Sequence, residues 1–143
     1  MTVRRLLLSL PIAALGLSMS ACSQLNNLLG NPTSPSTNTS TTDTFNGTLA
    51  PNSSIVFTFS VATAGNVAIT LAAVSPAATG PLGLGVGPSN NGSCTIANGT
   101  SGAIASTTPQ LSASENPGSY CVTVSDAGSL AATSTVTVTV THP

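Results

Sequence analysis

Few side chains beyond residue 21 are able to act as an acid or a base, and the many serines are not nucleophiles without a base to activate one. Glu115 and Asp126 both adjoin turn residues, and the single histidine, His142, precedes the last residue. Acid–base catalysis needs such groups placed together. We expect His142 to lie in a solvated tail. We expect Glu115 and Asp126 to serve turns, where a carboxylate accepts backbone hydrogen bonds. The sequence therefore predicts no catalytic residue and no enzyme activity.

The first 21 residues have the three-part pattern of an export signal. Met1–Arg5 is a short basic start, and Leu6–Leu17 is mostly apolar but too short to span a membrane. Small residues follow up to Ala21. Ser20-Ala21-Cys22 resembles a bacterial lipobox, in which the cysteine thiol accepts diacylglycerol; the family usually has Leu where Met19 stands. The resemblance implies a lipoprotein signal peptide at 1–21.

The same resemblance implies that Cys22 becomes the lipid-bearing N-terminus of the mature protein. The partner would be a membrane, reached through the acyl chains on Cys22, and stable anchoring takes two or more chains. By the sorting rule of Gram-negative lipoproteins, Ser23 implies transfer to the outer membrane. Two alternatives stay open: an ordinary signal peptide that leaves Cys22 as a free thiol, and a twin-arginine signal at Arg4-Arg5.

The other two cysteines, Cys94 and Cys121, are expected to form a disulfide. An odd cysteine in an exported protein needs an explanation, and lipidation of Cys22 leaves an even pair. The two cysteines lie 121 − 94 = 27 positions apart. A disulfide that closes a loop of this length would stabilise the fold by about 3–4 kcal/mol. The alternatives are two free thiols or a metal site, but a metal needs about four ligands and no histidine or carboxylate is spaced to join. We predict no metal and no cofactor.

Charge excludes several classes of partner. Only 3% of the residues are charged, and no Lys or Arg follows Arg5. Binding to nucleic acid depends on basic side chains that neutralise phosphates, so we exclude it. Attraction to anionic lipid headgroups and a basic clamp for a phosphorylated substrate are excluded for the same reason.

Composition divides the mature chain into a tether and a domain. Residues 22–43 are rich in Ser, Thr, Pro and Asn, and their second half has no apolar periodicity, which predicts a flexible linker. From Thr44 to Pro143 apolar residues alternate with polar or small ones, the period of a half-buried β-strand. Five segments show this alternation, namely 55–61, 67–73, 82–86, 120–125 and 135–141. Further candidates are 44–50, 93–97 and 101–111.

These elements predict an all-β domain over 44–143, a small antiparallel β-sandwich of the immunoglobulin-like or jelly-roll-like kind. Cys121 alternates out of phase with Tyr120 and Val122, which places the disulfide on the outer face or at an edge. Gly83, Gly85 and Gly87 alternate within one strand. No lysine and no helix follow them, so we expect close packing of another strand and not a phosphate loop.

The layout of the domain resembles that of the bacterial pre-peptidase C-terminal domains. The matching segments are Phe45–Leu49, Ser54–Phe59, Gly65–Leu71, Asn116–Asp126 and the closing Thr135–Thr141. The resemblance implies an accessory β-sandwich without chemistry of its own. Some members bind calcium through acidic loops, and this chain lacks the carboxylates for that.

Two functions follow as hypotheses. The first is a non-catalytic module of the cell envelope that binds a protein or glycan partner or has a structural role. The second is an accessory subunit of a separately encoded secreted hydrolase, active on peptides or glycans. A single Tyr and the absence of Trp weaken a sugar-stacking site.

Overall fold

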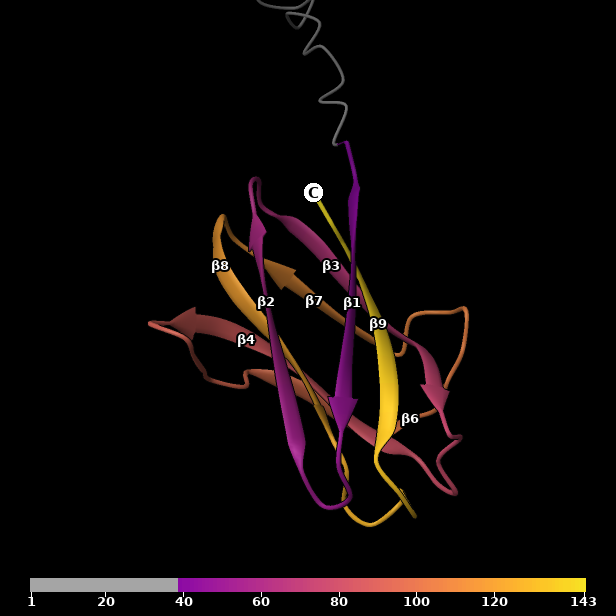
Figure 1. Ribbon diagram of the computed structural model, residues 1–143. Coiled ribbons are helices and arrows are strands. Elements are labelled where there is room, and N and C mark those ends of the chain that lie inside the picture. Colours follow the sequence, from indigo (N-terminus) through magenta and orange to yellow (C-terminus); the bar gives the residue numbers. More distant parts are fainter. Residues whose placement is uncertain (1–38) are drawn as a thin grey trace, which may run out of the picture. The chain divides into compact units, whose positions relative to one another are not determined.

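The computed structural model describes residues 39–143, which form nine β-strands and no helix (Figure 1). The predicted export signal, Cys22 and most of the predicted linker lie outside the described residues. The strands are β1 (Thr41–Leu49), β2 (Ser54–Val61), β3 (Gly65–Ser75), β4 (Leu82–Asn90), β5 (Ser93–Cys94), β6 (Asn98–Ala103), β7 (Leu111–Glu115), β8 (Gly118–Ser125) and β9 (Ser134–His142).

The strands form two antiparallel sheets that pack face to face. One sheet has the order β1-β9-β3-β7. The other has the order β2-β8-β4, with the short β5 and β6 pairing at the free edge of β4. The predicted fold class, an all-β antiparallel sandwich, is confirmed.

Alternation along each strand produces the inner and outer faces. In β9, Val136, Val138 and Val140 are fully buried, whereas the threonines between them face the other way. In β8, Val122 lies opposite Phe57 of β2 in the strand register. Since successive side chains of a strand point to opposite faces, the period of two fixes which row enters the core.

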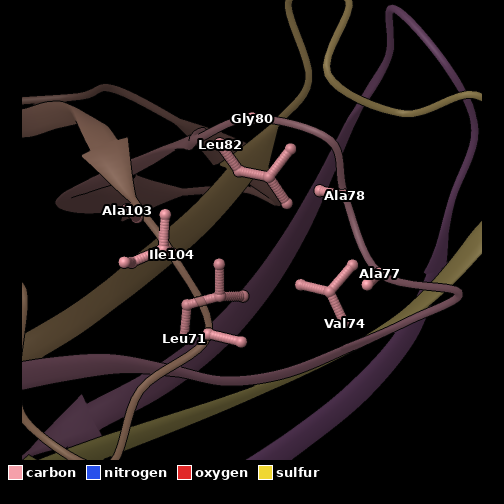
Figure 2. A pocket seen from close by; sticks show the side chains of 9 residues that line it. Leu71, Val74, Ala77, Ala78, Gly80, Leu82, Ala103 and Ile104 are labelled. Atoms are coloured by element: carbon pink, nitrogen blue, oxygen red, sulfur yellow. The ribbon is translucent and has the colours of Figure 1, made fainter.

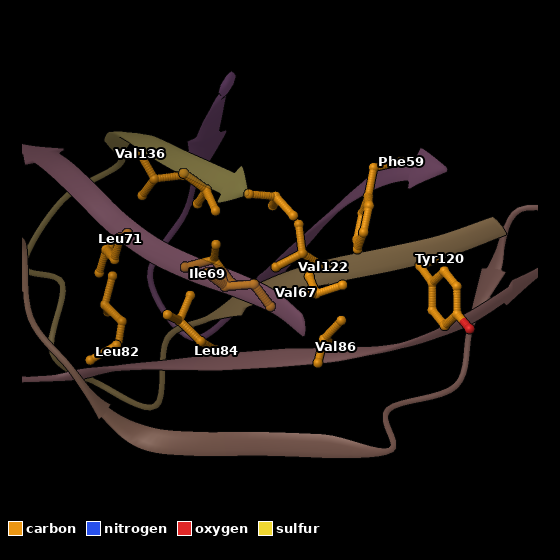
Figure 3. Close-up of a cluster of buried hydrophobic side chains, with 14 of the residues drawn as sticks. Phe59, Val67, Ile69, Leu71, Leu82, Leu84, Val86, Tyr120, Val122 and Val136 are labelled. Carbon is orange, nitrogen blue, oxygen red and sulfur yellow. The ribbon is translucent and has the colours of Figure 1, made fainter. Parts of the chain in front are cut away.

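The core between the sheets consists mainly of aliphatic side chains (Figure 3). Ile69 and Leu71 of β3 meet residues of the opposite sheet such as Leu84 and Val122. Two pairs of aromatic rings add to this core. Phe45 of β1 stacks on Phe57 of β2 in the opposite sheet, with ring centroids 5.3 Å apart. Phe59 of β2 stacks on Tyr120 of β8 in the same sheet, with ring centroids 5.9 Å apart. These stacked pairs add to the apolar area that the sandwich buries.

Most strands extend beyond their predicted bounds, β3 to Gly65–Ser75 and β4 to Leu82–Asn90. Three further differences concern the start of the domain and the weaker candidates. β1 begins at Thr41, three residues before the expected start of the domain, because its register with β9 continues to His142. The candidate strand 93–97 shrinks to the two residues of β5. The candidate 101–111 divides between the end of β6 and the start of β7, with a loop at 104–110 where Pro109 has no N–H to donate to a ladder.

Candidate functional site

The predicted disulfide joins Cys94 of β5 to Cys121 of β8, with their Cα atoms 5.7 Å apart. Cys121 points to the outer face of its sheet, as predicted, yet it is completely buried. The cover comes from the segment after β5, which hydrogen-bonds β4 through Thr95 N to Pro88 O and Ala97 N to Val86 O. We call residues 93–97 the outer clip.

The outer clip depends on a glycine. Gly87 pairs with Cys121 in the register, and a Cβ atom on Gly87 would overlap the carbonyl oxygen of Thr95. The hairpin between β4 and β5 that starts the clip turns at Asn91 and Gly92, both with positive φ, as two-residue type I′ hairpins require. Backbone does pack closely on Gly87, but it comes from residues 95–97, which follow β5, and not from another strand as predicted.

Asp126 is buried at the end of β8 and organises the turns around it. Its carboxylate accepts hydrogen bonds from the backbone N–H groups of Asn52 (2.8 Å), Ser129 (2.7 Å) and Leu130 (3.1 Å). These bonds, that from Asn52 above all, hold the pKa of Asp126 below its usual range although burial opposes them. The predicted role in a turn is confirmed, and the carboxylate also ties this turn to the β1–β2 turn.

His142 does not lie in a solvated tail, and that prediction is wrong. The side chain is 6% exposed, because β9 continues to His142 and places it on the inward row after Val140. Its ring centroid lies 5.5 Å from that of Phe59, and Nε2 donates to Asp43 Oδ2 at 3.1 Å. The parity of residues 136, 138, 140 and 142 was the signal in the sequence for this burial.

Glu115 and Asp126 lie at opposite ends of β8 and do not form a catalytic pair. Eight residues of strand separate them, or about 26 Å at the usual rise per residue. Glu115 instead interacts with Tyr120. The pKa of the Tyr120 phenol is raised, mainly by burial and secondly by the negative charge of the Glu115 carboxylate. The Tyr120 hydroxyl donates to Asn116 O at 2.9 Å. The two carboxylates therefore serve separate local structures.

Within residues 39–143, no three His, Cys, Asp or Glu side chains come close enough to hold a metal ion together. That same part of the chain has no helix long and apolar enough to cross a membrane.

Among the hollows that the described residues line, two stand out. The larger, about 400 Å³, lies on the outer face beside the β4–β5 hairpin and is lined by polar side chains such as Thr58, Ser60 and Ser119. The smaller, about 100 Å³, lies between β3, β4 and β6 and is lined by Gly and aliphatic side chains, among them Leu71, Leu82 and Ile104 (Figure 2). We call the smaller one the apolar cavity.

No protein-family model, curated protein or solved structure matches this chain. The lipoprotein and pre-peptidase C-terminal resemblances therefore stay predictions.

The sequence does not predict the apolar cavity. Its walls come from two segments, the continuous stretch 71–82, which runs from β3 through the β3–β4 loop to the start of β4, and residues 103–105 at the end of β6. Ile104 is 62% exposed, and an isolated exposed isoleucine gives no signal in the sequence.

Proposed function

We propose that this chain is an exported, lipid-anchored module of the bacterial cell envelope that acts by binding and not by catalysis. The lipid on Cys22 holds the protein at the membrane, and the β-sandwich faces the periplasm or the exterior. In a Gram-negative cell, Ser23 favours the outer membrane.

The observation that carries this proposal is the pairing of Cys94 with Cys121. Disulfides persist in oxidising compartments outside the cytosol. The bond also accounts for two of the three cysteines, so that Cys22, directly after the signal-like segment, is the one left for lipidation.

The positions of the ionisable groups support a role without catalysis. Asp126 accepts three backbone hydrogen bonds, and His142 packs against Phe59 with its Nε2 bonded to Asp43. Glu115 lies at the far end of β8 from Asp126. Within the described residues, each of these groups has a structural contact that explains its presence.

Replacing Cys22 by Ser tests the anchor. Cys22→Ser should move the protein from the membrane fraction to the soluble fraction of the envelope, because the serine hydroxyl does not receive the diacylglycerol. Fractionation with quantitative immunoblotting measures the change, and mass spectrometry of the native N-terminal peptide should show the lipid on Cys22.

The double variant Cys94→Ala/Cys121→Ala is the matched control, since it removes two other thiols. It should stay in the membrane fraction. Unchanged fractionation of Cys22→Ser together with an unmodified Cys22 in the wild-type peptide would refute the anchor.

A further inference from the structure

Asparagine is followed directly by glycine three times in the sequence, at Asn46-Gly47, Asn91-Gly92 and Asn98-Gly99. This dipeptide is a reactive context for an asparagine side chain, because glycine has no Cβ atom to shield its backbone nitrogen. That nitrogen is able to attack the carbonyl carbon of the asparagine side chain and close a five-membered ring. All three asparagines are exposed, so exposure does not distinguish them.

The first pair lies within a paired strand. Asn46 and Gly47 of β1 face Thr137 and Val136 of β9 in the strand register. The Asn46 side chain is also engaged, since its Oδ1 accepts a hydrogen bond from Thr137 Oγ1 at 2.7 Å. Ring closure needs rotation about the Cα–C bond of the asparagine, and in a paired strand this rotation breaks the hydrogen bonds between strands.

The third pair is held in the same way. Asn98 and Gly99 of β6 face Val86 and Gly85 of β4 in the register. The preceding residue is fixed as well, because Ala97 N donates to Val86 O at 2.9 Å. Rotation at Asn98 therefore requires β6 to separate from β4.

Asn91-Gly92 is different because it forms the tip of the β4–β5 hairpin, which projects from the body of the sandwich (Figure 1). The register ends at Asn90 opposite Ser93, so neither tip residue has a partner on another strand. Within residues 39–143, no hydrogen bond holds the Asn91 side chain. A Cβ atom at Gly92 would have nothing within 4 Å. The tip is therefore able to rotate without opening a sheet.

We propose that Asn91 is a site of spontaneous covalent modification, with water as the co-reactant. The Gly92 nitrogen forms a bond to Asn91 Cγ, the bond from Cγ to Nδ2 breaks, and Nδ2 leaves as ammonia with the proton that Gly92 N gives up. Water then hydrolyses the cyclic imide. Opening at one C–N bond gives aspartate, and opening at the other gives isoaspartate, in which the backbone runs through the former side chain.

The modification changes the charge of the larger hollow, on the outer face beside this hairpin. Asn91 and Gly92 line that hollow together with hydroxyl side chains such as Thr58 and Ser60, and none of its lining residues is charged. Each converted molecule gains a carboxylate there, and no Lys or Arg follows Arg5 to neutralise it. This site goes beyond the proposed function and does not depend on the lipid at Cys22.

Ageing of the folded full chain tests the site, with Asn46 and Asn98 as internal controls. The buffer is mildly alkaline and is made with water that carries the heavy isotope of oxygen, which labels only the conversions that occur during ageing. Chymotrypsin cuts the chain, since trypsin has no Lys or Arg after Arg5. Tandem mass spectrometry then locates the label. Asn91 should convert at least about tenfold faster than either control, because a hairpin tip opens at a lower cost than a paired strand.

The unfolded chain provides the second measurement. In urea with reductant, Asn46, Asn91 and Asn98 should convert at similar rates, since each precedes a glycine and no strand holds it. Isoaspartate should accompany aspartate at position 91, because both come from the cyclic imide. Similar rates in the folded chain, a preference for Asn91 that persists after unfolding, or aspartate without isoaspartate would overturn the proposal.

Two glutamine variants form a matched pair. Glutamine keeps the amide but has one more methylene, so its ring closes less readily. Asn91→Gln should abolish the acidic species that ion exchange separates from the aged wild type, whereas Asn98→Gln should leave that species unchanged. Equal loss in both variants would refute the site. Fractionation of Cys22→Ser reports on the anchor alone, so the two proposals fail separately.

Discussion

Asp126 joins two loops that are far apart in the sequence. Its carboxylate accepts N–H groups from Asn52, 74 residues earlier, and from Ser129 and Leu130 directly after it. A carboxylate that is ionised in the folded state satisfies three donors that the turns would otherwise leave to water. The same bonds lower its pKa, and they make the stability of the domain depend on pH.

Asp126→Asn should therefore change the acid limb of the stability curve. Because the folded state has the lower pKa, the contribution of Asp126 is fully present above the pKa of the unfolded chain and is lost as pH falls through the folded-state pKa. The variant should have a lower Tm at pH 7 and a smaller loss of Tm between pH 5 and pH 2. Thermal unfolding followed by circular dichroism at several pH values measures both.

Glu115→Gln serves as the control, since it removes a carboxylate outside these turns. It should retain the dependence of Tm on acid pH. An Asp126→Asn variant with the wild-type acid limb would contradict the role of the backbone hydrogen bonds.

Among the strands, β4 requires a glycine at position 87 because the backbone of the outer clip covers its outer face there. The outer clip crosses Gly87, and its Cys94 end is bonded to Cys121 on the neighbouring strand β8. A side chain on Gly87 would separate the clip from the sheet. Glycine costs backbone entropy in a strand, and here the close approach of Thr95 explains why it is present.

Gly87→Ala should destabilise the domain by about 1–3 kcal/mol, as is typical when an added group meets packed backbone. Urea unfolding measures the free energy of unfolding. Gly102→Ala is the matched control, because the nearest atom to a Cβ at Gly102 is 3.7 Å away and its φ is not positive. The control should be near neutral, and equal losses in both variants would contradict the packing explanation.

For the domain as a whole, the disulfide compensates for a core of small side chains. Most of the fully buried side chains are valines and leucines, and the described residues contain three Phe and one Tyr. A domain of this size buries a modest share of its surface. The bond between Cys94 and Cys121 closes a loop over a sequence separation of 27 and restricts the unfolded chain.

Removing both cysteines should lower the free energy of unfolding by about 3–4 kcal/mol. Cys94→Ala/Cys121→Ala is compared with wild type by urea unfolding, with and without reductant. Reductant should destabilise the wild type and leave the double variant unchanged. Intact mass of the wild type should increase by two hydrogens on reduction, and the absence of that increase would contradict the bond.

Local periodicity in the sequence determines much of this protein. Val136, Val138 and Val140 face inward because neighbours in a strand point to opposite sides. The same alternation buries His142. The prediction that His142 is in solvent was wrong because it rested only on the closeness of His142 to the C-terminus. The arithmetic of three cysteines led to the Cys94–Cys121 pair. The all-β class and the inner rows depend on residue type and short-range spacing, and the disulfide was inferred from the number of cysteines, both of which a sequence displays directly.

Tertiary structure alone decided which strands are neighbours and which hollows result. The sheet orders, the burial of Cys121 under the outer clip and the contact of His142 with Asp43 all join residues far apart in the chain. The apolar cavity arises where β7 stops short of the end of β3. Each outcome depends on the fit of non-local surfaces, and period-two alternation is the same for every strand, so it cannot specify which strand pairs with which.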